Sequence, residues 1–432
     1  MTKSAYPQLL FADERGKVFE YPALAASGMK AARFFGLDPA EFVKLPASSE
    51  LFMLPDRHPV GFDPETGETV VLKSNPYSKK AAPCFAVAAF ISPGYTLTHS
   101  ASYAEEPGAK MLPLFAYAPC AYYKGAFYTS AIRVDKSLRH DSAHLDMNEV
   151  AKNLKNFKKL FPKNRLIPHL GNCATVNSCA NAKNFFLGRF EVPVPTSIAC
   201  NAQCQGCISF QPVDRIPSTQ NRIEFVPTPE EIAEIALYHI ERASDPMVSF
   251  GQGCEGEPTL SGDVIEKSIR LIRQKTSRGI ININTNASRP LVIAKLFDAG
   301  LGSVRVSMNS AQSVYYARYY QPKGYSFDDV CHSIVEAKKR GGFVSVNYLS
   351  VPGFTDWEEE ASAFKNFIRE YKIDMIQWRN LNYDPLHYFR DLKLSGEDHK
   401  LLGMRQTMDL LRKESPRLRM GYFNPTKLAI ST

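Results

Sequence analysis

The sequence predicts an α/β protein: a partial, TIM-like (β/α)6 barrel with an additional β-rich amino-terminal domain. From about residue 190, short apolar stretches alternate with amphipathic helical stretches, whereas the preceding region is rich in turn signals and lacks this alternation. Repeated strand–helix units imply a parallel sheet with right-handed crossovers. We therefore predict a β-rich domain of unassigned fold at 1–165, a connecting segment at 166–189, the barrel at 190–415 and a carboxyl-terminal tail at 416–432.

The amino-terminal region offers few local signals. Residues 63–67 read as a turn, and Lys124-Gly125 predicts a hairpin between 119–123 and 126–129. A basic helix is predicted at 148–161. The connecting segment contains Cys173 and Cys179.

The barrel elements follow in order. The first helix begins at Thr228, which can cap it, with Pro229 in the first turn and Glu231 completing a capping box. The predicted strands are a stretch ending at 198–199, then 247–250, 280–286, 304–309, 343–349 and 374–381. The helices after the first are predicted at 262–276, 290–299, 327–340, 357–371 and 396–413.

Polar residues alternate with apolar ones along the third, fourth and fifth strands. Parallel strands that are covered on both faces normally read as continuous apolar runs, and a closed eight-stranded barrel fills its interior with branched apolar side chains. Six units with a polar interior therefore predict an open barrel around a ligand cavity. An amphipathic antiparallel sheet is the alternative, and the intervening helices argue against it. The alternating polar residues are Asn282, Asn284, Asn286, Arg305, Ser307, Asn309, Ser345 and Asn347.

One short stretch supplies three thiols within eight residues: Cys200, Cys204 and Cys207. An ordinary [4Fe–4S] cube takes four cysteine ligands, so three without a near fourth would leave one iron open to a small molecule. A structural zinc site or a reduced cysteine cluster without metal are the alternatives. Zinc usually brings a second closely spaced ligand pair, and none follows Cys207 closely.

A glycine- and glutamate-rich turn at 251–260 follows one strand–helix unit later. Its sequence is Gly-Gln-Gly-Cys-Glu-Gly-Glu-Pro-Thr-Leu. Glycine lets a backbone carbonyl approach a ligand closely, and a carboxylate at a strand end can hold an ammonium group.

The Cys-x3-Cys-x2-Cys spacing, followed by this Gly-Glu-Pro turn, resembles the radical S-adenosylmethionine (radical SAM) superfamily over about 190–415. The resemblance implies that Cys200, Cys204 and Cys207 bind three irons of a [4Fe–4S] cluster. The fourth iron would be chelated by the amino and carboxylate groups of S-adenosylmethionine. Gly206 departs from the family, whose members often carry an aromatic residue before the third cysteine.

The same resemblance assigns the remaining cofactor contacts and the activity. Asn284, Asn286, Ser307 and Asn309 end strands at the face where barrel chemistry sits, so they are candidates for the ribose and carboxylate. The residues that would lie by the methionine amino group are Glu255, Gly256 and Glu257. The implied reaction is reductive cleavage to methionine and a 5′-deoxyadenosyl radical, which abstracts hydrogen from an unidentified substrate. A non-catalytic iron–sulfur or zinc scaffold or assembly protein is the alternative, and it leaves the turn and the polar interior without a role.

The composition limits which partners and which cellular compartment we expect. The net charge is +8, with lysines gathered on the predicted basic helix; this face is either simply solvated or docks an acidic electron donor of flavodoxin or ferredoxin type. No nucleic-acid-binding signature is present, and no run approaches the roughly 18 apolar residues of a membrane span. The amino terminus lacks an apolar secretory segment. An odd count of nine cysteines fits metal ligands in a reducing compartment, so we expect a cytoplasmic protein.

Four cysteines lie upstream of the main motif: Cys84, Cys120, Cys173 and Cys179. A second metal site would require them to converge on one centre, and we expect at least one to stand apart. Cys254 and Cys331 are interpreted as core residues.

Overall fold

The computed structural model describes residues 6–46, 48–212, 215–394 and 399–425. The chain forms two compact units. The first unit comprises Met1–Val134, Leu349–Ala363 and Trp378–Lys413, and the second comprises Asp135–Tyr348, Phe364–Gln377 and Glu414–Thr432. Both units are discontinuous in sequence, whereas the four predicted segments follow one another along the chain.

The second unit is built on a seven-stranded sheet whose strands follow one another in sequence order. Pairing is parallel from β14 through β18 and again between β19 and β20. This arrangement confirms the predicted α/β class with a parallel sheet. The strands are β14 (Glu191–Val194), β15 (Met247–Phe250), β16 (Ile280–Thr285), β17 (Ser303–Met308), β18 (Phe343–Ser350), β19 (Met375–Asn380) and β20 (Arg419–Gly421).

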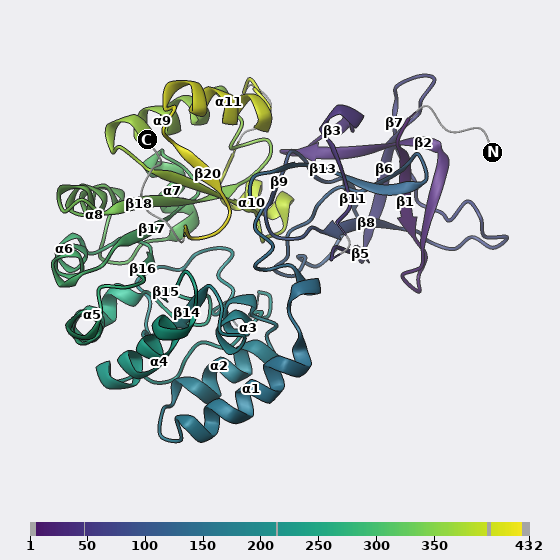
Figure 1. The fold of residues 1–432 in the computed structure, drawn as a ribbon. Helices are drawn as coiled ribbons and strands as arrows, with labels where there is room; N and C mark the ends of the chain where they lie inside the picture. Colours follow the sequence, from purple (N-terminus) through teal and green to yellow (C-terminus); the bar gives the residue numbers. More distant parts are fainter. Residues whose placement is uncertain (1–5, 47, 213–214, 395–398, 426–432) are drawn as a thin grey trace. The chain divides into compact units, whose positions relative to one another are not determined.

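Helices follow the strands as predicted, and Figure 1 shows α4, α5, α6 and α8 side by side along the sheet. The apolar members of the alternating strands, such as Ile281, Ile283 and Val306, are fully buried. The helices after β14 are α4 (Pro229–Arg242), α5 (Gly262–Lys275), α6 (Pro290–Ala299), α7 (Ser313–Tyr320), α8 (Phe327–Lys339), α9 (Glu358–Glu370), α10 (Pro385–Asp391) and α11 (Met404–Glu414). Three more precede β14: α1 (Met147–Leu160), α2 (Leu166–Thr175) and α3 (Ala180–Phe186).

Two predicted boundaries were wrong. The first strand ends at Val194 and not at 198–199, because the main chain of 196–199 bonds to the 251–257 turn and not to a neighbouring strand. The last predicted helix begins at Met404, because Leu401 forms a β-bridge with Trp357 and the Leu402 N–H donates to the Asp356 carbonyl. Residues 395–398 of that prediction lie outside the described residues.

The first unit contains a thirteen-stranded sheet among the described residues, with antiparallel pairing throughout, which confirms the β-rich amino-terminal region. The predicted hairpin is present as β12 and β13, and both turn residues, Lys124 and Gly125, have positive φ. The strands are β1 (Gln8–Ala12), β2 (Val18–Lys30), β3 (Arg33–Gly36), β4 (Phe42–Lys44), β5 (Glu50–Met53), β6 (Arg57–Phe62), β7 (Thr69–Val71), β8 (Phe85–Phe90), β9 (Tyr95–Leu97), β10 (Ser100–Ala101), β11 (Tyr103–Glu105), β12 (Ala121–Tyr123) and β13 (Ala126–Arg133). Of the helices in the described ranges, none has the length and apolar character needed to cross a bilayer.

Candidate functional site

The cysteine loop leaves the carboxyl end of β14 and is fixed to the chain around the end of α7. The Gln203 N–H donates to the Tyr320 carbonyl at 2.9 Å, and the Gln205 N–H donates to the Tyr319 carbonyl at 3.1 Å. The Lys323 N–H donates to the Asn201 carbonyl at 2.8 Å. These main-chain bonds hold the loop on both sides of Cys204.

The three thiols are partly buried and interact electrostatically. Burial raises the pKa of Cys204 well above its usual value, and the negative charges of Cys207 and Cys200 raise it further. Burial likewise raises the pKa of Cys200. A cationic centre between the three sulfurs would offset this repulsion and stabilise the thiolates.

Arg222 is a neighbour of the loop that the sequence did not reveal. Its Nη2 lies 3.9 Å from Cys207 Sγ, its Nε lies 3.4 Å from Ser209 Oγ, and its guanidinium stacks over the Phe210 ring. The residue stands in an irregular segment fifteen positions after Cys207, so no periodicity could have placed it there. It brings a fixed positive charge to the Cys207 thiol.

The 251–257 turn lies directly against the start of the cysteine loop. The Gly256 N–H donates to the Ser197 carbonyl at 2.7 Å and the Glu257 N–H to the Ala199 carbonyl at 2.8 Å. A Cβ at Gly256 would lie 1.8 Å from the Ala199 oxygen, which no side chain permits. The sequence therefore needs glycine here for a close approach between two backbone segments.

Glu255 is buried and bonded to main-chain groups of the same junction. Its Oε2 accepts from the N–H groups of Thr196 and Ser197 at 2.7 and 2.9 Å, and its Oε1 accepts from Gln252 N–H at 2.7 Å. Burial raises its pKa to about 7, against the opposing effect of these bonds. The carboxyl group thus joins the end of β14 to the turn after β15.

Glu257 makes the corresponding connection to the end of β16. Its Oε1 accepts from the N–H of Thr259 at 3.0 Å and from the Thr285 hydroxyl, and its Oε2 accepts from the Asn286 N–H at 2.8 Å. Burial raises its pKa. A carboxylate oxygen has two acceptor sites, so Oε2 retains capacity beyond this bond. Its contact with a cofactor ammonium stays a prediction.

Asn284 and Asn286 both lie at this junction. Asn284 Nδ2 donates to the Gly251 carbonyl at 2.8 Å, and Asn286 Nδ2 donates to Asn201 Oδ1 at 2.9 Å. The Asn201 amide in turn donates to Ser288 Oγ at 2.9 Å. The structure therefore brings the cysteine loop, the turn and the end of β16 together through side-chain bonds.

Ser307 and Asn309 lie one strand further along. Ser307 is half-buried on β17, and Asn309 follows that strand, is fully buried and donates from Nδ2 to the Tyr315 carbonyl at 3.2 Å. This bond leads into α7, whose last residues hold the cysteine loop. A single pocket shared by all four polar residues stays a prediction.

Two tyrosines near the cysteine loop were also missed. The hydroxyl oxygens of Tyr316 and Tyr325 lie 3.2 Å apart. Burial raises the pKa of both, and the charge of Cys204 adds to the effect. The aromatic spacing within α7, which contains Tyr316, is typical of ordinary core packing, so no sequence pattern associates these hydroxyls with the cysteines.

The polar residues of the strands bond to one another in the interior of the second unit. Ser303 Oγ donates to Asn282 Oδ1 at 2.8 Å, and Arg305 Nη1 donates to Gln377 Oε1 at 3.1 Å. Gln377 Nε2 also donates to Asn424 Oδ1 at 3.1 Å. The alternation in the sequence thus corresponds to a polar face that is buried and internally hydrogen-bonded.

Comparison with known protein families finds a match to one segment of the chain. The model of the radical SAM superfamily matches residues 194–364, a segment that includes the cysteine loop and the 251–257 turn. Residues 194–364 are a radical SAM domain. The domain confirms the family predicted from the motifs. Its cofactors are those of the family, a [4Fe–4S] cluster and S-adenosylmethionine, and membership implies an enzyme.

The solved structures that are similar to this chain have low sequence identity to it. "Native anSMEcpe with bound AdoMet" is 17% identical with a TM-score of 0.36, covering 45% of this chain and 52% of that one, about half of its length. Methylornithine synthase is 15% identical with a TM-score of 0.37, covering 66% and 77%. A radical SAM methyltransferase from Sphaerobacter thermophilus is 14% identical with a TM-score of 0.38, covering 55% and 67%. No curated protein matches the sequence. Likenesses at this level support no conclusion about the substrate.

Proposed function

We propose that this enzyme cleaves S-adenosylmethionine reductively to methionine and a 5′-deoxyadenosyl radical that abstracts hydrogen from a substrate. The observation that carries the proposal is the junction of two motifs inside the radical SAM domain. Backbone bonds join the cysteine loop to the glycine–glutamate turn at Ser197–Gly256 and Ala199–Glu257. When bound, the cluster supplies the electron for this cleavage, and the protein supplies orientation and exclusion of water.

Within the proposal, Cys200, Cys204 and Cys207 hold three irons. Glu257 and Asn286 stand beside them, because the carboxylate of Glu257 accepts from the Asn286 N–H and Asn286 bonds to Asn201 of the loop. Glu255, Gly256, Asn284, Ser307 and Asn309 complete the proposed S-adenosylmethionine site. The free acceptor capacity of Glu257 Oε2 suits a cofactor ammonium group.

We also propose that the sheet is a partial (β/α)6 barrel. Asn424 supports this, since its side chain bonds to Gln377 on β19 at 3.1 Å and to Glu191 on β14 at 3.2 Å. In a flat sheet these strands would lie five spacings apart, about 24 Å. One asparagine reaches both only if the sheet curls. A substrate cavity would then lie at the carboxyl ends of the strands.

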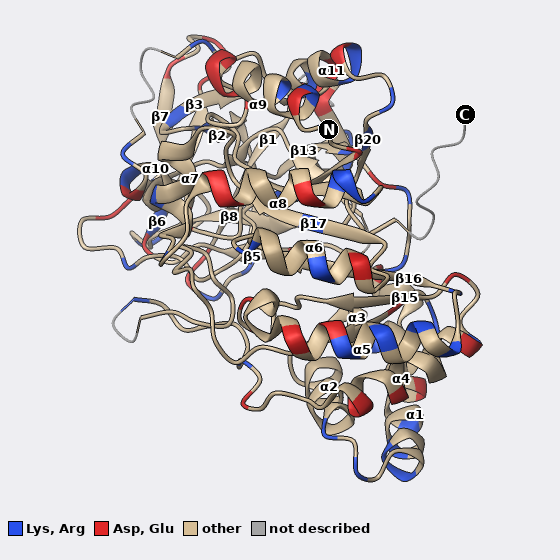
Figure 2. Cartoon of the chain, turned by 90° about the vertical axis from the view of Figure 1, so that its left-hand side faces the viewer, with Lys and Arg blue, Asp and Glu red and all other residues tan. Residues whose placement is uncertain are grey.

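The proposed reductant is an acidic electron-donor protein of flavodoxin or ferredoxin type. Figure 2 shows basic residues along α1. Lys152, Lys155, Lys158 and Lys159 are all exposed there, and none of them forms an ion pair with another described residue. A surface of unpaired positive charge favours docking of an acidic partner. An oxygen-sensitive cluster further favours the cytoplasm as its compartment.

Anaerobic reconstitution tests the proposed function. The protein, reduced with dithionite and supplied with S-adenosylmethionine, should form 5′-deoxyadenosine and methionine slowly without its substrate. The triple variant Cys200→Ala, Cys204→Ala, Cys207→Ala should lose the cluster and form neither product. Full iron and sulfide content in that variant would show that these thiols do not hold the cluster, and a cluster without any cleavage would favour a non-catalytic scaffold.

A further inference from the structure

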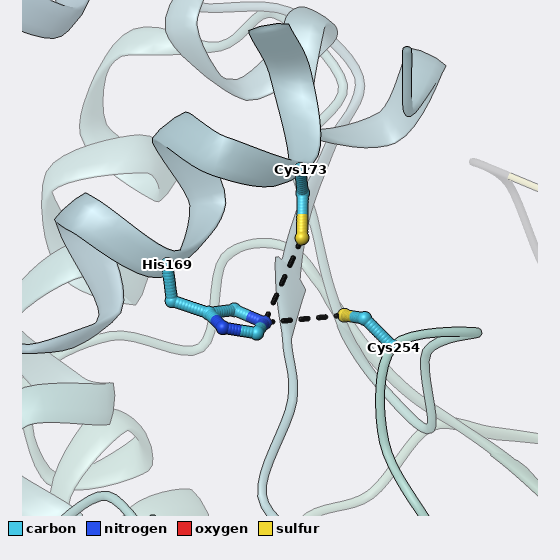
Figure 3. Close-up of side chains that lie close together, drawn as sticks. All are labelled: His169, Cys173 and Cys254. Carbon is cyan, nitrogen blue, oxygen red and sulfur yellow. Dashed lines mark hydrogen bonds between the residues drawn. The ribbon is translucent and has the colours of Figure 1, made fainter. Parts of the chain in front are cut away.

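A second set of metal-ligand side chains lies in the helical part of the second unit. Figure 3 shows His169 and Cys173 of α2 facing Cys254 of the 251–257 turn. His169 Nε2 lies 3.4 Å from Cys254 Sγ and 3.6 Å from Cys173 Sγ, and the three ligand atoms all lie within 4.8 Å of one another. Cys173 and Cys254 are 2% and 6% exposed and His169 is half-buried, so protein encloses the two thiols while the imidazole is partly exposed.

Local structure explains how these residues meet. His169 and Cys173 are four residues apart on α2, which places both on one face of the helix. Cys254 is brought to them by the turn whose glutamates join β14 and β16, and its carbonyl accepts from the Ile223 N–H at 2.7 Å. Cys179, which precedes α3, donates its N–H to the Cys173 carbonyl at 2.9 Å and provides a further thiol at the same helix junction.

One hydrogen bond at the imidazole nitrogen does not account for both of its thiol contacts. A neutral imidazole nitrogen has either one lone pair or one proton, so Nε2 can make one good hydrogen bond, yet two thiols approach it. A tetrahedral zinc ion with Zn–N near 2.05 Å and Zn–S near 2.3 Å would hold its nitrogen and sulfur ligands about 3.6 Å apart. The two observed distances agree with that value within about 0.2 Å.

The ligand atoms of the group are close enough together for one ion. Ligand atoms that all lie within 4.8 Å of one another can share a single ion, whereas a cube separates its thiolates over different irons. Two thiolates with one imidazole are borderline-soft donors, which suit zinc better than magnesium, calcium or manganese.

We propose that His169, Cys173 and Cys254 bind one zinc ion that is separate from the [4Fe–4S] cluster. Cys179 or a water molecule takes the fourth position. The ion fixes the 251–257 turn to α2 and thereby positions Glu255 and Glu257, which belong to the same turn. The site is structural: it holds the cofactor-binding turn in place and takes no part in electron transfer.

Metal analysis of the full-length protein tests this site independently of turnover. Protein purified anaerobically should contain about one zinc per chain in addition to iron. The triple variant of Cys200, Cys204 and Cys207 should lose iron and retain zinc. Adding Cys173→Ser and Cys254→Ser to it should remove the zinc, whereas adding Cys331→Ser, a buried thiol on α8, should not.

Cobalt substitution covers the case in which the serine variants fail to fold. In the triple variant, Co²⁺ in place of zinc should give thiolate-to-cobalt charge-transfer bands and the visible bands of a tetrahedral site. His169→Cys should retain the metal and shift those bands, since a thiolate replaces the imidazole. The proposal would be overturned by protein that contains no zinc, or by a zinc content that does not change when Cys173 and Cys254 are replaced. A Cys173–Cys254 disulfide in the anaerobic protein would also overturn it.

Discussion

At the scale of single residues, the candidate site contains two buried carboxylates that accept hydrogen bonds mainly from main-chain N–H groups. Glu255 and Glu257 each accept several bonds from neighbouring segments. The sequence predicted both residues from the Gly-Glu-Pro turn but could not show that they also join strands. That second role depends on main-chain N–H groups of Thr196, Ser197 and Asn286, which no motif encodes.

Glu257→Gln should therefore lower stability as well as S-adenosylmethionine affinity. The glutamine amide has one acceptor oxygen, whereas the donors around Glu257 bond to both carboxylate oxygens. A hydrogen bond to a charged group contributes about 1.5–3 kcal/mol. We expect the free energy of unfolding to fall by about that amount without cofactor, with affinity reduced roughly ten- to a hundredfold. Urea unfolding and a titration followed by the cluster's paramagnetic resonance measure the two effects.

Glu266→Gln at a half-buried position on α5 is the matched control, because within the described part of the chain its carboxylate forms an ion pair with Arg270 alone. Its effect on unfolding should stay below about 1 kcal/mol. If Glu257→Gln changes affinity but leaves stability untouched, the junction does not depend on this side chain.

Arg222 leads to a second prediction at this scale. A positive charge beside a cluster ligand favours the reduced, more negative state of the cluster. Arg222→Gln should therefore leave the iron content unchanged and make the reduction potential more negative. Lys267→Gln, at an exposed position on α5, removes the same charge elsewhere and should leave the potential unchanged. Equal potentials for the two variants in a redox titration would contradict the assigned contact with Cys207.

At the scale of secondary-structure elements, the predictions that rested on a defined local interaction, such as a helix cap, were confirmed. The capping box of α4 is formed as predicted by Thr228 and Glu231, and α6 has the predicted bounds. The first strand was predicted too long because its apolar continuation bonds to a turn distant in sequence. The pairing of His169 and Cys173 with Cys254 was missed for the same reason, since a four-residue helical spacing gives no sign of a third ligand.

The α4 cap gives a pH-dependent prediction. Arg165 lowers the pKa of Glu231 to about 2 from 4.5, so ionised Glu231 stabilises the fold above about pH 4.5, and this stabilisation is lost as the pH falls toward 2. Glu231→Gln should cost about 1 kcal/mol at pH 7, and the difference from wild type should shrink below pH 4.5. Glu230→Gln, exposed in the same turn, should change little at either pH. Urea unfolding at pH 7 and pH 3 measures this, and a constant difference would contradict the assignment.

At the scale of the whole molecule, the sequence pattern predicted the class of each sheet. It did not predict which segments of the chain form each unit. Alternation of polar residues such as Asn282 and Arg305 indicated a polar interior, and there Asn282 accepts from Ser303 and Arg305 donates to Gln377. The return of Leu349–Ala363 and Trp378–Lys413 to the first unit could not be predicted, because it depends on long-range contacts. The stretch expected to be a tail contributes β20 and Asn424 to the second unit.

Asn424 therefore gives the prediction that tests the curvature of the sheet. Its buried side chain accepts from Gln377 of β19 and donates to Glu191 of β14, and removing it takes one hydrogen bond from each partner. The loss of a partner from a buried polar group costs about 1–3 kcal/mol, so Asn424→Ala should lower the free energy of unfolding by about that amount. Hydrogen exchange should accelerate in β14 and β19 together, although the two strands lie far apart in sequence. Asn366→Ala, which removes an exposed asparagine bonded to Arg369 on α9, should affect neither strand. Faster exchange confined to β19 and β20 would mean that Asn424 stabilises only its own edge, and the support for a curled sheet would be lost.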